Sequence, residues 1–483
     1  MLAHLAYKEF LDSLLNQRFM LLAIFSIILM PLSAWINYAY YEARKEAFDS
    51  QYAEYVTSEE DGAVNRAYRT PALMSTLARG NEPYMPIYYT FQRTASGSQN
   101  DATTPGNIEA QDFSILSTFG GFDFLFLVQV VFSLLAILLA FDMIAGEKER
   151  GTLKAVLANS VPRDKLIFAK FLGGFSVLWL TFLIGFLLLL LVLTLFNSQF
   201  TAVDMLGRIG FVFMFATLFL AGFYGLGLMV STFCHSSRTA IIVLLVLWVM
   251  MQLVIPKAGE MIAVVVKPTQ SEHEVRLQRQ KVLTEELAAL DDKAGELFTD
   301  ITGISAAEKA FLHLRTDDPS VGAFRDAYQA SFQASKQRQH DRIRAIAQNW
   351  QREKDVQRSF GNAIALISPA SALTLLVSDV AGTGDLAYQR YREAVADQYQ
   401  VVDREYFSQM ESNSYRINIG GAMLSGNFEQ EAASPQSVPP FTVPNPSLAD
   451  ITKANTWPLV TLLCYLVIPF LVGYVRFLNY DAR

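Results

Sequence analysis

Charged residues and cysteines are scarce in this sequence of 483 residues, and each shortage excludes a class of protein. Only 18% of the residues are charged, whereas soluble domains carry about 25%. Hydrophobic residues make up 52%. The deficit of charge falls in a few long apolar runs, and the segments between them are as polar as soluble domains. This distribution is typical of membrane spans joined by aqueous domains.

The two cysteines, Cys234 and Cys464, lie in or beside apolar runs, and the long polar segments have none. The polar segments therefore lack a disulfide framework and must be stable through their own packing. Metal sites built on paired cysteines are excluded. The five histidines are scattered along the chain, which is poor evidence for a metal site. The net charge of −7 argues against nucleic-acid binding, which normally needs a basic face.

Catalytic signatures are also missing, since neither H-E-x-x-H nor G-x-S-x-G occurs. Gly146 and Gly151 have the spacing of a phosphate-binding loop, but Thr152 stands where that loop needs a lysine. Asp123 and Asp142 lie near the ends of one apolar run, so we expect both to be interfacial. Acids inside the runs are nearly absent, which disfavours a proton-coupled carrier. We expect no catalytic, metal or cofactor site in this chain.

Six apolar segments are long enough to cross a bilayer, which takes about 20 helical residues. They cover residues 19–38, 122–145, 171–196, 209–233, 240–262 and 457–477. The first could be mistaken for a secretory signal peptide, but its core is too long and no small-x-small pattern follows. We therefore expect a retained span, preceded over residues 1–18 by an amphipathic helix along the cytoplasmic surface.

Lysines and arginines in short loops set the orientation. The loop 146–170 is rich in both, Arg238 lies between the fourth and fifth spans, and Arg476 and Arg483 end the chain. All lie on one side if both termini are cytoplasmic, which leaves residues 39–121 and 263–456 outside. The sequence thus predicts an all-α polytopic membrane protein with six transmembrane helices, both termini inside, and a mainly helical extracytoplasmic domain.

The segment 362–382 is apolar enough to suggest a seventh span. Pro369 interrupts it, and a seventh crossing would move the C-terminal arginines outside, so we prefer an element at the outer interface or packed on the bundle. Periodic apolar residues over 272–358 predict two or three long amphipathic helices with a turn at Thr302-Gly303, and a further helix covers 386–409. Residues 94–111 are predicted to be a loop and 429–445 an extended connector.

The loop 146–170 is the most informative segment. Its charged helix end is followed by Gly151 and a short helix that Thr152 can cap. An apolar stripe runs along this helix, and Pro162 then begins the helix of the third span. Such a helix, held on two membrane helices, can carry force between a soluble partner and the bundle. The plainer alternative is a basic loop that only fixes the topology.

This loop resembles the signature of type-2 ABC exporter (ABC-2) permeases, which read E-x-x-x-G-T, a short helix, P-x-S/T/R and a lysine entering the third span. The matching residues are Glu147, Gly151, Thr152, Pro162, Arg163 and Lys170. Lys8-Glu9-Phe10 before the first span and Tyr480 to Arg483 after the last are also similar to the family. Residues 368–371 with 381–383 resemble the subgroup with a large exterior insertion before the last helix.

The resemblance implies the permease subunit of an ABC transporter, with a coupling helix that docks on a separate ATPase subunit. The coupling residues would be Glu147, Lys148, Glu149, Arg150, Gly151, Thr152, Leu153, Val156, Leu157, Pro162 and Arg163. This chain would bind no cofactor, because ATP and Mg belong to the ATPase subunit. Two six-span halves, identical or related, would form an exporter in the bacterial cytoplasmic membrane. The resemblance assigns no residue to substrate.

Three alternatives remain. The ATPase could drive motion of the exterior domain against a periplasmic or envelope partner, with no transport; the near absence of polar residues in the spans fits this and also fits a lipophilic cargo. A non-transporting scaffold for the exterior domain predicts no bound ATPase and no effect of altering residues 147–157. A membrane enzyme is the weakest interpretation, since no catalytic constellation is visible.

Overall fold

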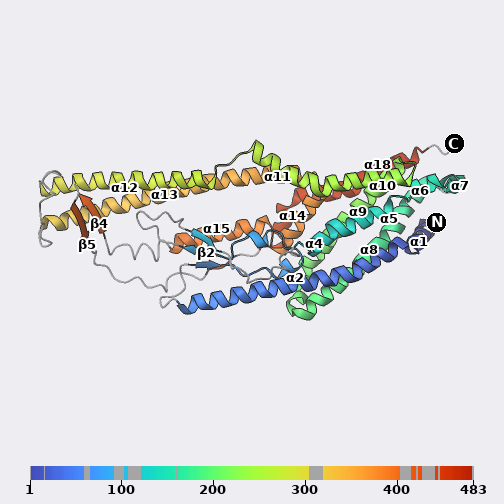
Figure 1. Cartoon of the computed structure of the whole chain (residues 1–483), viewed down its shortest axis with the longest axis horizontal. Helices are drawn as coiled ribbons and strands as arrows, with labels where there is room; N and C mark the ends of the chain where they lie inside the picture. The colour runs from blue at the N-terminus through green and yellow to red at the C-terminus, as the bar shows by residue number, and fades with distance from the viewer. Residues whose placement is uncertain are drawn as a thin grey trace.

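The computed structural model describes residues 2–15, 17–58, 66–91, 103–106, 121–158, 162–303, 319–402, 415–419, 422–426, 441–443 and 446–480. Over these residues the molecule is elongated, with a helical bundle at one end and a long two-helix stalk at the other (Figure 1). The first helix and the end of the last one lie together at the bundle end (Figure 1). We call this the terminal end and the opposite one the stalk end.

The predicted count of six spans is confirmed, because six helical segments among the described residues are long and apolar enough to cross a membrane. Four are single helices: the first lies in α2 (Gln17–Ser58), and the others are α8 (Arg163–Phe196), α9 (Val203–Phe233) and α18 (Thr456–Leu478). The second span combines α4 (Phe124–Phe126), a π-helical turn (Leu127–Phe132), α5 (Ser133–Ala140) and α6 (Ala145–Glu149). The fifth combines α10 (Ser237–Val249), a π-helical turn (Met250–Val254) and α11 (Ile255–Val266).

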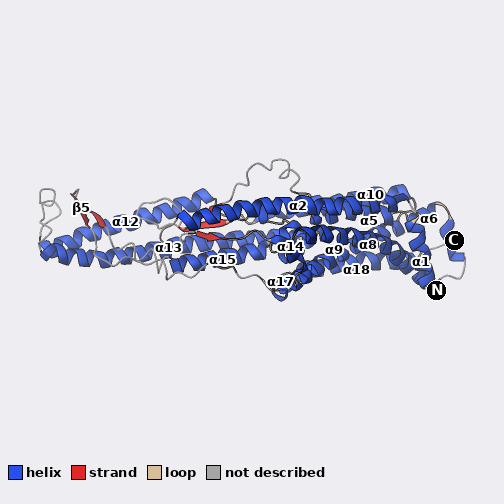
Figure 2. Ribbon diagram, turned by 90° about the horizontal axis from the view of Figure 1, so that it is seen from below, coloured by secondary structure: helices blue, strands red, loops and turns tan. Residues whose placement is uncertain are grey.

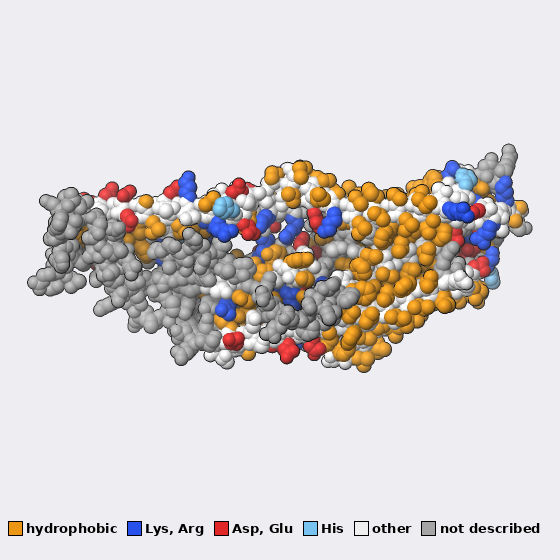
Figure 3. Space-filling model, viewed as in Figure 1, with side chains coloured by type: hydrophobic (Ala, Val, Ile, Leu, Met, Phe, Trp, Pro, Cys, Tyr) orange, Lys and Arg blue, Asp and Glu red, His pale blue; other side chains and the backbone are white. Residues whose placement is uncertain are grey.

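The outside of the bundle is apolar. Hydrophobic side chains cover it, while charged side chains gather at the terminal end and along the stalk (Figure 3). In the middle of the bundle α9 packs against α18, α5 and α8. In the most apolar window of α9, 67% of the residues are buried, against 11% in the fifth span. The fifth span is therefore the least enclosed of the six.

Segment 362–382 folds as the end of one helix and the start of another. The long helix α13 (Pro319–Ala365) stops, and α14 (Pro369–Ala381) begins after Ser368, whose hydroxyl accepts a hydrogen bond from the Ala370 N–H at 3.1 Å. The Tyr465 hydroxyl donates to the Ile367 carbonyl at 2.5 Å, about 13 Å along α18 from its stalk-end start at 1.5 Å per residue. The α13–α14 turn therefore dips into the bundle and returns, and α14, with 13 residues, is too short to span.

Side-chain hydrogen bonds tie the two π-helical turns to each other and to α14. The Gln252 amide donates to the Gln129 carbonyl at 2.8 Å, and the Gln129 amide donates to the Thr374 hydroxyl at 2.7 Å. The Ser368 hydroxyl donates to the Met251 carbonyl. A π-helical turn misaligns the backbone ladder, so its carbonyls are free to accept such bonds. The second span, the fifth span and α14 are thereby joined away from water.

A small base domain lies beside the stalk end of the bundle. Strands β1 (Arg66–Tyr68), β2 (Tyr88–Phe91) and β3 (Thr103–Gly106) form an antiparallel sheet in that order, with 3-10 turns at Leu73–Thr76 and Glu82–Tyr84. Helix α15 (Asp385–Val402) packs Tyr391, Val395, Tyr399 and Val402 on Ala67 and Phe91. The helical face expected in 386–409 is thus confirmed over its described part. The loop expected over 94–111 is wrong at β3, whose four residues pair with β2 through the backbone.

The stalk is formed by α12 (Glu272–Thr302) and α13, the long amphipathic helices predicted from periodicity. Ser271 and Glu274 form a capping box at the start of α12, and Gly303 ends it with φ +70°, at the expected turn. A hydrophobic core between the helices contains Leu290, Ala294, Phe298, Phe324 and Tyr328. The hairpin of β4 (Tyr415–Ile419) and β5 (Ala422–Gly426) lies beside α12. Short strands and turns complete a largely helical fold (Figure 2).

The stalk is fixed to the fifth span by a close helix crossing. A Cβ on Gly259 of α11 would lie 2.8 Å from the Gly361 carbonyl oxygen and 2.9 Å from the Ala365 nitrogen of α13. On the stalk side of the crossing, the Trp350 indole donates to the Gln270 carbonyl at 2.8 Å, and the Gln357 amide donates to the Lys267 carbonyl at 2.6 Å. Backbone contact and these bonds clamp α13 onto the α11–α12 joint, so the fifth span and the stalk form one continuous arm.

Replacing Gly259 with Val should separate α11 from α13, because the new side chain meets backbone atoms that cannot move aside. We expect a loss of stability of about 1–3 kcal/mol, measured by unfolding of the purified protein and by faster hydrogen exchange in α11. Gly295→Ala on α12 is the control: its Cβ meets nothing within 4 Å, and the change should raise helix stability by up to about 1 kcal/mol. Unchanged exchange in α11 of Gly259→Val would contradict the clamp.

The stalk should weaken in acid. Burial alone would raise the pKa of Glu286, but hydrogen bonds from Arg342 at 3.0 Å and Arg338 at 3.2 Å outweigh it and leave this pKa below its ordinary value. The ion pairs therefore stabilise the hairpin fully above the ordinary pKa of glutamate and are lost as pH falls through the lower folded-state pKa. The protection factors of α12 amides, which correct for the slower intrinsic exchange in acid, should fall in this range, and Glu286→Gln should reduce this pH dependence.

Candidate functional site

Several helix ends meet at the terminal end of the bundle. They belong to α1 (Leu2–Leu14), α6, α7 (Thr152–Ala158), the start of α8, the end of α9, the start of α10 and the end of α18 (Figure 1). We call this assembly the platform. The loop 146–170 lies within it and folds as the sequence predicts, with a charged helix end, a break and a short helix. Gly151 has φ +72°, a left-handed conformation that glycine adopts without strain, and its N–H donates to the Lys148 carbonyl at 3.1 Å.

A buried lysine joins three helices of the platform. Lys170 of α8 is 2% exposed, and its ammonium lies 2.8 Å from a carboxylate oxygen of Glu147 on α6 and 3.2 Å from one of Glu9 on α1. Gly173, one turn later, lets α1 approach closely, since a Cβ there would lie 2.6 Å from the Ala6 carbonyl oxygen. One ammonium against two carboxylates leaves this triad with a net negative charge. Glu147 therefore faces the bundle, and α1 is held against α8.

The rest of α6 is bound to the ends of α9 and α10. The Lys148 ammonium donates to the Thr232 carbonyl and, at 3.2 Å, to the Cys234 carbonyl, where α9 ends. The Ser231 hydroxyl accepts the N–H groups of Ile144 and Ala145 at 3.0 and 2.9 Å. A carboxylate oxygen of Glu149 accepts the Ser237 N–H at 3.0 Å, at the start of α10. A carboxylate at a helix N-terminus and an ammonium at a C-terminus both complement the helix dipole, so these contacts fix α6 to both helices.

The apolar stripe of α7 faces the bundle. Leu153 is fully buried with Ile144, Leu166, Ile167, Leu228 and Phe477, and Val156 and Leu157 pack against this cluster. Pro162 precedes α8, and the Arg163 guanidinium donates to the Leu478 and Tyr480 carbonyls at 2.8 Å each, at the end of α18. These residues hold α7 and the start of α8 in place.

The outer face of the platform is polar. Of the predicted coupling residues, those exposed are Glu149, Arg150, Gly151 and Thr152. The Arg150 guanidinium donates to the Gly146 carbonyl at 3.1 Å, and the Thr152 hydroxyl donates to the Glu147 carbonyl at 3.3 Å, with Thr152 itself the first residue of α7. Lys154, Ala155 and Ala158 are exposed on α7 as well, though the sequence did not single them out. Only part of the predicted coupling set is therefore exposed, and the exposed surface also includes residues of α7 that the set does not contain.

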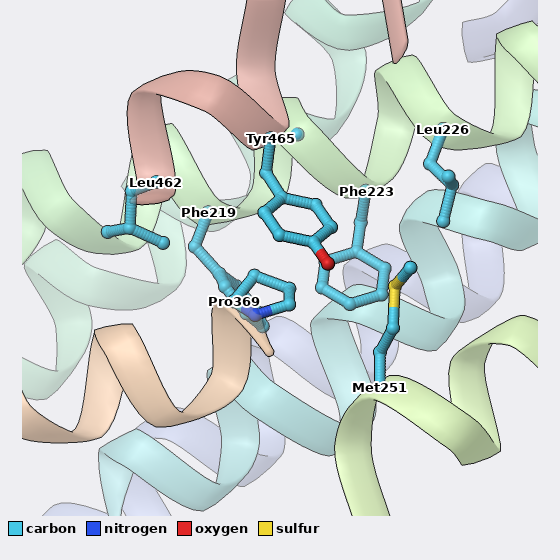
Figure 4. A pocket seen from close by; sticks show the side chains of 8 residues that line it. Phe219, Phe223, Leu226, Met251, Pro369, Leu462 and Tyr465 are labelled. Atoms are coloured by element: carbon cyan, nitrogen blue, oxygen red, sulfur yellow. The ribbon is translucent and has the colours of Figure 1, made fainter. Parts of the chain in front are cut away.

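An apolar groove lies among α9, α18, α14 and the π-helical turn of the fifth span, away from the platform. The side chains around it include Phe219, Phe223, Leu226, Met251, Pro369, Leu462 and Tyr465 (Figure 4). The Tyr465 hydroxyl is already bonded to Ile367. The groove has no charged side chain among its lining residues and offers only apolar contact.

The fold and the platform define a polytopic helical membrane protein with a polar exposed face at the end that carries its terminal helices. The sequence profile of the ABC-2 family transporter proteins matches residues 3–482, nearly the whole chain, so this protein belongs to that family. The chain is also similar to the probable ABC transporter permease protein NosY of Pseudomonas aeruginosa. The two are 40% identical over 77 residues, which are 16% of this chain and 28% of that protein.

Lys170→Met should destabilise the platform strongly, because the carboxylates of Glu9 and Glu147 would lose the buried ammonium that both contact. Removing one partner of a buried ion pair typically costs about 3–5 kcal/mol, to be measured by unfolding in mixed micelles. Adding Glu9→Gln and Glu147→Gln should restore part of the loss. The control is Lys165→Met on the exposed side of α8, with an expected change within about 0.5 kcal/mol. Equal losses in the two single variants would refute the role of the triad.

Proposed function

We propose that this chain is the permease subunit of an ABC transporter and that a separate ATPase subunit docks on the outer face of α7 and the loop before it. The observation that carries the proposal is the division of this loop into two sides. Its inner side is bound to α1, α8, α9, α10 and α18 through the contacts described above, while its outer side carries exposed polar and small residues. A partner that pushes on α7 would displace several spans together.

The contacts give two routes for such a push. Through Glu149, a displacement of the loop would move the start of α10, and with it the fifth span and the stalk. The Lys170 triad passes it to α8 and α1. Both routes use charge-assisted hydrogen bonds, which are the stronger kind, so the loop cannot move without these helices. ATP and Mg would be bound by the partner, and this chain would contribute no catalytic residue.

The terminal end is cytoplasmic in this proposal, since the short basic loops lie there. The membrane would be the bacterial cytoplasmic membrane, and a second six-span half, identical or related, would complete the transporter. The fifth span fits this pairing because so little of it is buried within one chain. Export of an apolar cargo agrees with spans that carry few polar groups. Membrane lipid surrounds the rest of the apolar surface.

A second function is favoured by the continuity of the fifth span with the stalk. The Gly259–Gly361 crossing makes a rigid arm from the platform to the far tip of the exterior domain. Such an arm can transmit motion to an envelope partner without moving a substrate through the bilayer. Reconstituted vesicles distinguish the two: ATP-dependent movement of any cargo supports transport, and ATP-dependent motion of the stalk alone supports transmission.

The docking face is tested by Lys154→Glu combined with Ala158→Arg. Both positions are exposed on α7, so we expect normal insertion and stability but at least a tenfold loss of co-purifying ATPase subunit, about 1.4 kcal/mol. Proteins bound to the wild-type chain, purified in mild detergent from its native membrane, are identified and assayed for ATPase activity. Lys281→Glu, an exposed charge reversal on the stalk, is the control and should bind normally. A wild-type chain without any ATPase partner would favour the scaffold instead.

A further inference from the structure

The stalk and the base domain have separate hydrophobic cores. The stalk core lies between α12 and α13, and the base core lies between α15 and the β1–β3 sheet. Among the described residues, neither core includes side chains from both α13 and α15. The two helices nevertheless lie side by side, and charged side chains of both signs gather where they pass each other (Figures 1 and 3). The contact between stalk and base is therefore polar.

Among the described residues, the contacts across this seam include two ion pairs and one ring contact. Arg358 of α13 lies 3.5 Å from Asp385 of α15, and Arg392 of α15 lies 3.6 Å from Asp355 of α13. The rings of His340 and Tyr399 stack with centroids 6.3 Å apart. Each helix supplies one acid and one base to the ion pairs, so sliding the helices would bring like charges together. The charge pattern thus fixes one register of the two helices.

The seam is weak enough to open. The side chains of both ion pairs remain 20–43% exposed to solvent, and exposed ion pairs contribute little to stability. Asp385 also accepts a hydrogen bond from the Asn81 amide at 2.6 Å, which keeps it fixed to the base domain whether or not Arg358 is present. At the other attachment, the backbones of α11 and α13 are in direct contact at Gly259 and Gly361. The stalk is therefore held firmly at its bundle end, by this crossing and by the α13–α14 turn, while its contact with α15 is releasable.

We propose that Asp355, Arg358, Asp385 and Arg392 form an electrostatic clasp that holds the stalk against α15 and releases it when α11 moves. In the released state the stalk turns about its bundle end while the base domain stays with α2. The clasp follows from the geometry of this chain. Its use in an ATP-driven cycle rests on the proposed function.

The test measures the stalk-to-base distance in the full chain, reconstituted in lipid nanodiscs without any partner. Cys234 and Cys464 are replaced with serine, and spin labels are placed at Ala345 on α13 and Ala396 on α15, both exposed. A second labelled pair, Ala345 with Ala288 on α12, reports the hairpin itself. We expect one main stalk-to-base distance at low salt and a second, longer one at about 1 M salt, where the Debye length falls to about 3 Å.

Charge variants then assign the effect to the clasp. Arg392→Glu should raise the longer-distance population about two- to fivefold at low salt, which corresponds to the free energy of one exposed ion pair. Arg358→Glu combined with Arg392→Glu should raise this population further. Asp355→Arg with Arg392→Glu restores the pair with reversed sign and should return the short distance. Lys281→Glu changes the net charge of the chain by the same amount as Arg392→Glu. As the control, it should leave the stalk-to-base distance distribution unchanged. A wild-type distribution in the Arg358→Glu, Arg392→Glu variant would overturn the clasp, as would an equal change in the Ala345–Ala288 distance.

Because no ATPase subunit is present in this experiment, its result does not depend on the proposed function. A clasp that opens with salt in a chain that binds no ATPase would leave the clasp standing and remove the coupling role. A chain that binds the ATPase but shows no clasp would leave the permease assignment standing.

Discussion

Inside a bilayer there is no water to satisfy a polar group, and this constraint shapes every polar contact of the bundle. Carbonyls at the π-helical turns accept bonds from Gln252 and Ser368. Burial in the platform makes the same demand at the end of the bundle, where the Lys170 ammonium is satisfied by two carboxylates and that of Lys148 by carbonyls at the end of α9. Each solution joins elements far apart in the sequence. The same constraint that makes these groups costly to bury therefore also links the spans into one mechanical unit.

The fold class could be predicted because span length and apolar composition are properties of the local sequence. The stalk could be predicted for a related reason: the buried faces of α12 and α13 repeat at helical spacing. Strand β3 could not, since its residues carry no alternating pattern and pair only because β2 is beside them. The depth of the α13–α14 turn was also beyond prediction. It depends on Tyr465 and Met251, which come from distant spans.

The platform shows the same limit at the level of single residues. The sequence placed Glu147, Lys148 and Leu153 in the coupling loop but gave no direction for their side chains, and all three contact the bundle. Glu9 and Lys170 were visible only as parts of a resemblance, because ion pairing across 161 positions leaves no local pattern. Most of the residues that carry the family resemblance in this loop thus bind the loop to the helices of the bundle. Recognition of a particular partner would fall to the exposed side of α7, about which the resemblance says little.

The fifth span connects the two ends of the molecule. It is tied to the platform at Ser237, to α14 and the second span at its π-helical turn, and to the stalk at Gly259. Little of its surface is enclosed by the rest of the chain, so few packing contacts within the chain resist its displacement. Firm attachments at a few points and little enclosure by the rest of the chain are what a lever needs, and the fifth span has both.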